Sequence, residues 1–286
     1  MRKPGVSRPD DAGHCALSLA SARRTSGAVT QLFDMKLRAL RRDRAANVGP
    51  ERFLAERVFE DCFERISLMK RKFERALLIG CLDPEWPRRL RSIAREVDVR
   101  DPGPSLAACA RGKLIIEDAW EPPPKSFDIV VAVGTLDTVN NLPLALRLIL
   151  ASMGPDGLII GALSGGDTLR QLRSAMRAAD TVLGVAAAHV HPRIQASALS
   201  PLLIDAGFIE PVVDVERVQV SYPSLERLVF DLRAMGATNV LQSKSPPLSR
   251  VQRSAAIRAF ADAGDGSRTT EIFEILHFAA WSRPSG

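Results

Sequence analysis

Aromatic residues are scarce in this chain of 286 residues: they make up 5% of the sequence, and there is a single tyrosine. Surfaces that bind single-stranded nucleic acid stack bases on aromatic side chains. The net charge of +6 is also local, because residues 1–50 hold 10 Lys/Arg and 4 Asp/Glu, whereas the other 29 basic and 29 acidic residues cancel. We therefore expect no nucleic-acid partner, since such proteins carry their positive charge on the folded domain.

Closely spaced cysteines are absent as well. The four cysteines form no Cys-x-x-Cys motif, and they are Cys15, Cys62, Cys81 and Cys109. This spacing predicts neither a zinc module nor a disulfide framework, and we expect reduced thiols and no bound metal.

Long apolar runs are also lacking. No segment approaches the roughly 18 residues of a membrane-spanning helix. Residues 1–30 have no apolar signal core, and Asp10 and Asp11 argue against a mitochondrial transit peptide. We expect residues 1–30 to be a disordered extension. The protein is then expected in the cytoplasm, or in the mitochondrial matrix if it is eukaryotic.

The rest of the chain, residues 31–286, alternates between strand-like and helix-like segments. Two helices are expected first, at residues 32–46 and from Pro50 onward. The first carries five basic residues between Lys36 and Arg44, which predict a solvated face or, alternatively, an acidic partner or a membrane surface. Apolar runs of strand length follow at 76–80, 97–101, 114–118, 129–134 and 158–163, with helix-compatible segments or turns between them.

This alternation predicts an α/β fold with a Rossmann-like, doubly wound sheet. Two further strands, "PVVDVERVQVSY" and "FEILHFAAWSR", bring the expected total to seven. Between them, residues 223–270 contain two helical stretches, so we expect a helical insertion before the last strand.

Ligands of such sheets bind beyond the carboxyl ends of the strands. Gly80 ends the first expected strand, Asp101 the second, Asp118 the third and Gly134 the fourth. A carboxylate at the second strand's end can accept two hydrogen bonds from a ribose, and an acidic group after the third can accept from an adenine amino group. Either aspartate alone could equally be a turn residue. Together they favour an adenosine-type ligand.

The segments "ALLIGC", "VDVRDPGPSLAA" and "SFDIVVAVGTLDTVNNLPLAL" resemble class I S-adenosylmethionine-dependent methyltransferases. The blocks "GGDTLRQLR" and "SYPSLERLVFDLRAMGATN" resemble one branch of that superfamily, which includes the arginine hydroxylase that assembles mitochondrial complex I, and its bacterial relatives. A more distant resemblance is to the carrier-protein methyltransferase of biotin synthesis.

The resemblance implies S-adenosylmethionine as cofactor and a set of residues that would hold it. Gly80, Cys81 and Leu82 would lie at its methionine end, Asp101 at the ribose, Asp118 and Ala119 at the adenine, and Val133 and Gly134 under the sulfonium. The family's glycine-rich loop is altered here, because Leu82 and Pro84 stand where glycines are usual. Leu82 adds bulk, and Pro84 removes a backbone donor.

Three functions follow as alternatives. The first is a methyltransferase acting on a protein or a small acidic substrate, for which no catalytic residue can be named because the cofactor carries the chemistry. The second is a complex I assembly factor of the arginine-hydroxylase kind, with a respiratory subunit as partner. The third is a scaffold that has lost the cofactor.

Other motifs are weaker. His189 and His191 are spaced for a metal pair, but no further ligand is near in sequence, so a loop or surface role is favoured. Asp231 and Arg233 could contact a protein substrate or simply pair on the surface of the insertion.

Overall fold

The computed structural model describes residues 31–48, 51–243 and 246–285. The expected disordered extension, residues 1–30, lies outside these ranges. The seven strands form one sheet of order β3-β2-β1-β4-β5-β7-β6. Their bounds are β1 Phe73–Ile79, β2 Ala94–Asp101, β3 Lys113–Leu114, β4 Phe127–Val133, β5 Met153–Ser164, β6 Ile209–Tyr222 and β7 Thr269–Trp281. β7 is antiparallel to both of its neighbours, and the remaining pairs are parallel.

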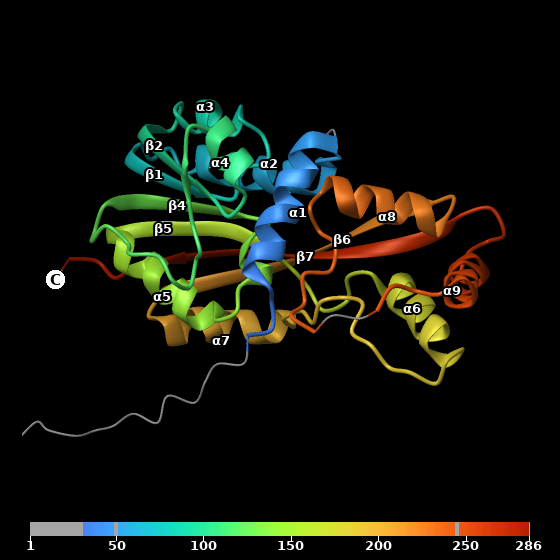
Figure 1. Cartoon of the computed structure of the whole chain (residues 1–286). Helices are drawn as coiled ribbons and strands as arrows, with labels where there is room; N and C mark the ends of the chain where they lie inside the picture. The colour runs from blue at the N-terminus through green and yellow to red at the C-terminus, as the bar shows by residue number, and fades with distance from the viewer. Residues whose placement is uncertain (1–30, 49–50, 244–245, 286) are drawn as a thin grey trace, which may run out of the picture.

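Helices cover both faces of the sheet (Figure 1). They are α1 Met35–Val48, α2 Phe53–Leu68, α3 Trp86–Leu90, α4 Pro104–Cys109, α5 Leu142–Ser152, α6 Arg170–Thr181, α7 Ala196–Ala206, α8 Leu225–Ala234 and α9 Arg250–Asp262, with a short 3-10 turn at Leu136–Thr138. The seven-stranded α/β architecture, its N-terminal helices and the helical insertion confirm the predicted fold class.

The alternation of side chains along β1 divides the core into two layers. Ala76 and Leu78 pack with α2 and α3 on one face, whereas Leu77 and Ile79 pack with α5 and α7 on the other. All four side chains are fully buried, which explains why this strand reads as a continuous apolar run.

The insertion forms a third core beside the sheet. β6 and β7 extend past the other strands, and α6, α8 and α9 pack against that extension, on the right in Figure 1. α9 begins with a capping box, in which the Ser249 and Gln252 side chains each accept a hydrogen bond from the other's backbone N–H. Leu228, Ala256 and Phe260 are buried in this core.

The third strand is shorter than predicted. Residues 114–118 were expected to form it, but β3 contains only Lys113 and Leu114. Glu117 turns inward instead, and the backbone N–H of Ala119 donates to the Ile116 carbonyl in a turn. A buried contact of Glu117, described below, replaces the expected strand pairing.

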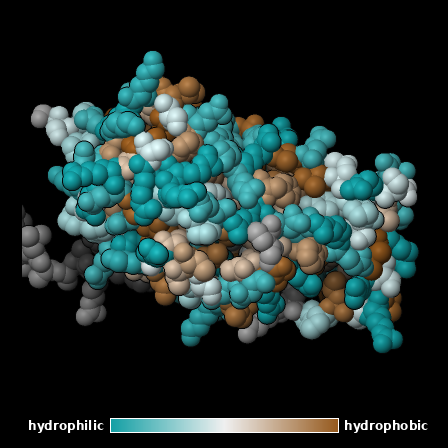
Figure 2. All heavy atoms as spheres, turned by 90° about the horizontal axis from the view of Figure 1, so that it is seen from above, coloured by the Kyte–Doolittle hydropathy of each residue, from teal (hydrophilic) through white to brown (hydrophobic). Residues whose placement is uncertain are grey.

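The face seen from above is mainly hydrophilic, with hydrophobic side chains scattered over it (Figure 2). Among the described residues, no helix is both long and apolar enough to cross a membrane.

The turn after β1 leaves no room for a side chain at Gly80. Its φ is +84°, and an added Cβ would lie 2.0 Å from the carbonyl oxygen of Val133. We expect Gly80→Ala to lower the free energy of unfolding by about 3 kcal/mol, because backbone strain and a steric clash add. Gly184 has a φ of +62° with nothing within 4 Å, so Gly184→Ala should lose only about 1–2 kcal/mol. Urea unfolding of both variants measures the difference, and equal losses would contradict the predicted clash.

Candidate functional site

The carboxyl ends of β1, β2 and β4 meet at one rim of the sheet. Asp101, at the end of β2, is fully buried there. Its Oδ2 accepts the backbone N–H of Cys81 at 2.8 Å, and its Oδ1 accepts that of Gly103 at 2.7 Å. The structure therefore brings Asp101 next to the turn after β1, as the sequence predicted.

Helix α1 supplies the remaining partner of Asp101. The Nε of Arg42 lies 2.9 Å from Oδ1, and one Nη lies 2.6 Å from Oδ2. The other Nη of Arg42 donates to the Gly134 carbonyl at 3.3 Å, so this side chain joins the ends of β2 and β4. Burial alone would lower the pKa of Arg42, but the Asp101 carboxylate outweighs burial and raises it. The guanidinium is thus held in its charged form.

Arg38 makes a second buried contact one helical turn away. Its two Nη atoms each lie 2.7 Å from an oxygen of Glu117, and one of them also donates to the Thr135 carbonyl at 2.6 Å. Glu117 is fully buried, and Arg38 is buried as well. Residues four apart lie on the same face of a helix, so α1 presents both arginines to the rim.

The prediction for the basic helix was therefore partly wrong, because Arg38 and Arg42 are buried. A solvated face, an acidic partner or a membrane surface was expected for residues 36–44, but Arg38 and Arg42 bind carboxylates of the chain itself. The i, i+4 spacing of Arg38 and Arg42 showed that they share a face. The sequence carried no signal that this face meets Asp101 and Glu117.

The expected adenine residues lie apart from that contact. Asp118 is half-buried, and its Oδ2 accepts the backbone N–H of Asn141 at 2.8 Å, just before α5. Ala119 is exposed. The carboxylate that faces the rim at this position is Glu117, one residue earlier than predicted.

Three of the remaining expected residues line a small cavity. Leu82, Val133 and Gly134 line a space of about 130 Å³, which also reaches Asp137 and Arg193. Asp137 and Arg193 form an ion pair of 2.7 Å. Burial alone would raise the pKa of Asp137, but the Arg193 guanidinium and a hydrogen bond from Ser164 lower it overall. Cys81 does not line this cavity, and burial, followed by the nearby Asp101, raises the pKa of its thiol to about 12.

This arrangement does not accept the adenosine of S-adenosylmethionine as it stands. A carboxylate offers about four lone-pair positions. Asp101 already accepts from the Cys81 and Gly103 backbones and twice from Arg42. A ribose diol could bind Asp101 only by displacing one of these donors, and Arg42 is the only side chain among them.

The glycine turn has a structural explanation that the sequence did not reveal. Gly80 is required because the β4 backbone passes close to it, at Val133. Gly134, in contrast, has a φ of +64° and no atom within 4 Å of an added Cβ. Of the two glycines, only Gly134 leaves open space beside its backbone.

The histidines have protein partners. His189 lies 2.9 Å from a carboxylate oxygen of Asp180. The Nε2 of His191 accepts the backbone N–H of Val240 at 2.8 Å, and burial and Arg193 lower the pKa of this ring to about 4. In the insertion, Asp231 is buried and pairs with Arg227, whereas Arg233 is exposed.

We expect Arg42→Met to lower the free energy of unfolding by about 3–5 kcal/mol, because it leaves the buried Asp101 carboxylate without a counter-ion. Arg253→Met, which removes an exposed partner of Glu226 at 3.7 Å, is the matched control and should lose less than about 1 kcal/mol. Urea unfolding compares the two variants. A loss below about 1 kcal/mol for Arg42→Met would mean that the pair is not closed in solution.

Known proteins share both sequence and fold with this chain. Residues 51–209 match the methyltransferase domain family. Arginine-hydroxylase NDUFAF5, mitochondrial, of Mus musculus is 30% identical, over 90% of this chain and 79% of its own length. Malonyl-[acyl-carrier protein] O-methyltransferase of Xylella fastidiosa is 30% identical, over 56% of this chain and 53% of its own length. The YcgJ protein of Bacillus subtilis has a similar fold, with a TM-score of 0.53 at 12% identity, covering 77% of this chain and 97% of that one. The chain belongs to the methyltransferase domain family and is methyltransferase-like in both sequence and fold.

Proposed function

We propose that this chain modifies a protein subunit of a respiratory complex, and that S-adenosylmethionine reaches its rim only after α1 has moved away. The observation that carries the proposal is the Arg42–Asp101 pair, in which a side chain of α1 occupies the acceptor expected to hold the ribose. The protein partner is suggested by the similarity to arginine-hydroxylase NDUFAF5, which extends over 90% of the chain.

The packing of α1 supports a movable helix. Its buried residues are Arg38, Arg42 and Ala45, so two of its three anchors are charged. Leu40 and Val48 are exposed, at 55% and 45%. A helix that docks through an apolar stripe loses that contact only at a large hydrophobic cost. Here a ligand that offers Asp101 alternative donors competes directly with one of the two buried ion pairs that hold α1.

The backbone contacts of Asp101 also support the proposal that the chain still binds the cofactor. The backbone N–H groups of Cys81 and Gly103 hold the carboxylate in place independently of α1. Apparent affinity is the intrinsic affinity multiplied by the fraction of molecules in the open state. The closed arrangement therefore predicts weak binding by the wild-type chain rather than none.

Calorimetry with S-adenosylhomocysteine tests the cofactor site. We expect Arg42→Lys to bind at least about tenfold more tightly than wild type, because lysine cannot form the paired guanidinium contact that holds α1 closed. The double variant Arg42→Lys/Asp101→Ala should bind about 1.5–3 kcal/mol more weakly than the single variant Arg42→Lys.

Two outcomes would contradict this part of the proposal. If no variant binds at millimolar concentration, the chain is a scaffold without cofactor. If Arg42→Lys and wild type bind equally, α1 does not compete with the ligand. Circular dichroism of each variant establishes that it is folded before binding is measured.

Affinity purification from respiring cells tests the partner. We expect a respiratory-complex subunit to co-purify with the wild-type chain and with Asp101→Ala. That subunit should carry a modification only when the wild-type chain is present, because Asp101 belongs to the cofactor site. A mass gain of one oxygen on arginine would identify hydroxylation, and a gain of one methylene group would identify methylation. An unmodified subunit in both strains would contradict a modifying role.

A further inference from the structure

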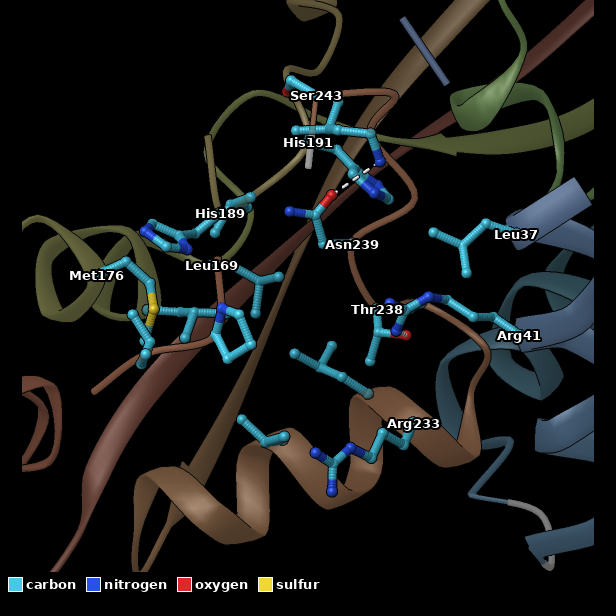
Figure 3. Close-up of a pocket in the computed structure, with 18 of the residues that line it drawn as sticks. Leu37, Arg41, Leu169, Met176, His189, His191, Arg233, Thr238, Asn239 and Ser243 are labelled. Atoms are coloured by element: carbon cyan, nitrogen blue, oxygen red, sulfur yellow. Dashed lines mark hydrogen bonds between the residues drawn. The ribbon is translucent and has the colours of Figure 1, made fainter. Parts of the chain in front are cut away.

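A larger cavity adjoins the small one beside Gly134 and shares four lining residues with it, Leu169, Arg193, Leu232 and Ala237. It has a volume of about 600 Å³ and is lined by residues of α1, α6 and α8 and by residues within 237–243 and 246–248. In Figure 3, Arg41 enters it from α1 and Arg233 extends from α8, while Leu169, Met176 and His189 lie on the opposite side. Its size is that of a small-molecule site.

The charges of this cavity are unbalanced. Three arginines line it, Arg41, Arg193 and Arg233, and no aspartate or glutamate does so within the described ranges. Arg193 is neutralised by an ion pair of 2.7 Å with Asp137, a residue that does not itself line this cavity. Arg41 and Arg233 form no ion pair with any described residue.

Arg41 in particular is only partly satisfied. One Nη donates to the Thr238 hydroxyl, but its Nε is buried and has no hydrogen-bond acceptor among the described residues. Partial burial and the neighbouring guanidiniums of Arg44 and Arg233 lower the pKa of Arg41, which shows that like charges surround it. The other Nη of Arg41 makes no hydrogen bond to a described residue, so an anionic ligand in the cavity could accept from it.

The histidines beside the cavity do not change this balance. His191 accepts the Val240 N–H and, with its pKa of about 4, is neutral at pH 7. His189 is already paired with Asp180. The excess positive charge therefore belongs to Arg41 and Arg233.

The rest of the wall is largely apolar. Its aliphatic and thioether side chains come from all four bounding segments, and they include Leu37, Leu172, Met176, Val229, Leu232 and Leu248. A ligand that consisted only of a charged group would leave this surface in contact with water. An apolar body joined to an anionic head would cover it and neutralise the arginines together.

We propose that this cavity binds an amphiphilic anion, with its apolar body against α6 and α8 and its carboxylate or phosphate on Arg41 and Arg233. The site goes beyond the proposed function, because the hydrogen-bond partners of Asp101 do not line this cavity. Leu37 and Arg41 belong to α1, so the site is complete only while α1 is docked.

Calorimetry with four probes tests the ligand class. Octanoate and octyl phosphate carry both features, octanol carries only the apolar body, and inorganic phosphate carries only the charge. We expect octanoate or octyl phosphate to bind saturably and at least about tenfold more tightly than octanol or inorganic phosphate, since a charge-assisted hydrogen bond contributes that much. The tighter of the two identifies the head group.

Arginine variants assign the binding to this cavity. Arg41→Met and Arg233→Met keep an apolar chain but remove the charge, and each should weaken binding at least about fivefold. Arg258→Met is the matched control, because Arg258 is exposed on α9 and does not line the cavity. The proposal is overturned by equal binding of octanol, by equal binding of inorganic phosphate, by no binding at about 10 mM, or by the same loss in Arg258→Met.

Discussion

The contact between Arg42 and Asp101 determines what the rim of this sheet can do. It links α1 to the end of β2, and through the Gly134 carbonyl it also reaches the end of β4. With the Cys81 and Gly103 backbones, it fills the acceptor positions of a fully buried carboxylate. Arg38 repeats the arrangement at Glu117. The protein thus covers its own rim with two guanidinium groups.

A buried ion pair is a weak net stabiliser but a specific one. Removing two charges from water has a free-energy penalty that offsets much of their attraction, whereas removing a single partner leaves an isolated buried charge. The pair therefore adds little to overall stability but fixes where α1 docks. A helix positioned in this way can be released by a ligand that satisfies the same carboxylate, and this is the physical basis of the proposed cofactor access.

The insertion gives the molecule a second environment with different chemistry. The long β6 and β7 carry α8 and α9 beyond the rest of the sheet, and α1 packs against α8 on one side. At the rim, Arg38 and Arg42 of α1 each pair with a carboxylate, whereas Arg41 of the same helix lines the cavity beside α8 without one. Two consecutive residues of α1 thus have different roles. Arg42 binds Asp101 at the rim, and Arg41 lines the cavity.

The sequence by itself determined the order of the elements and most of their positions. Apolar runs of strand length predicted the buried strands, and two helical stretches predicted the insertion. Asp101 lies at the end of β2, where the sequence predicted a strand end, because its apolar run stops there. Only the tertiary structure decided the partners. Asp101 lies 59 positions from Arg42, and Glu117 lies 79 from Arg38. Periodicity shows which side chains share a face of a helix, but not whether that face meets water or a buried carboxylate.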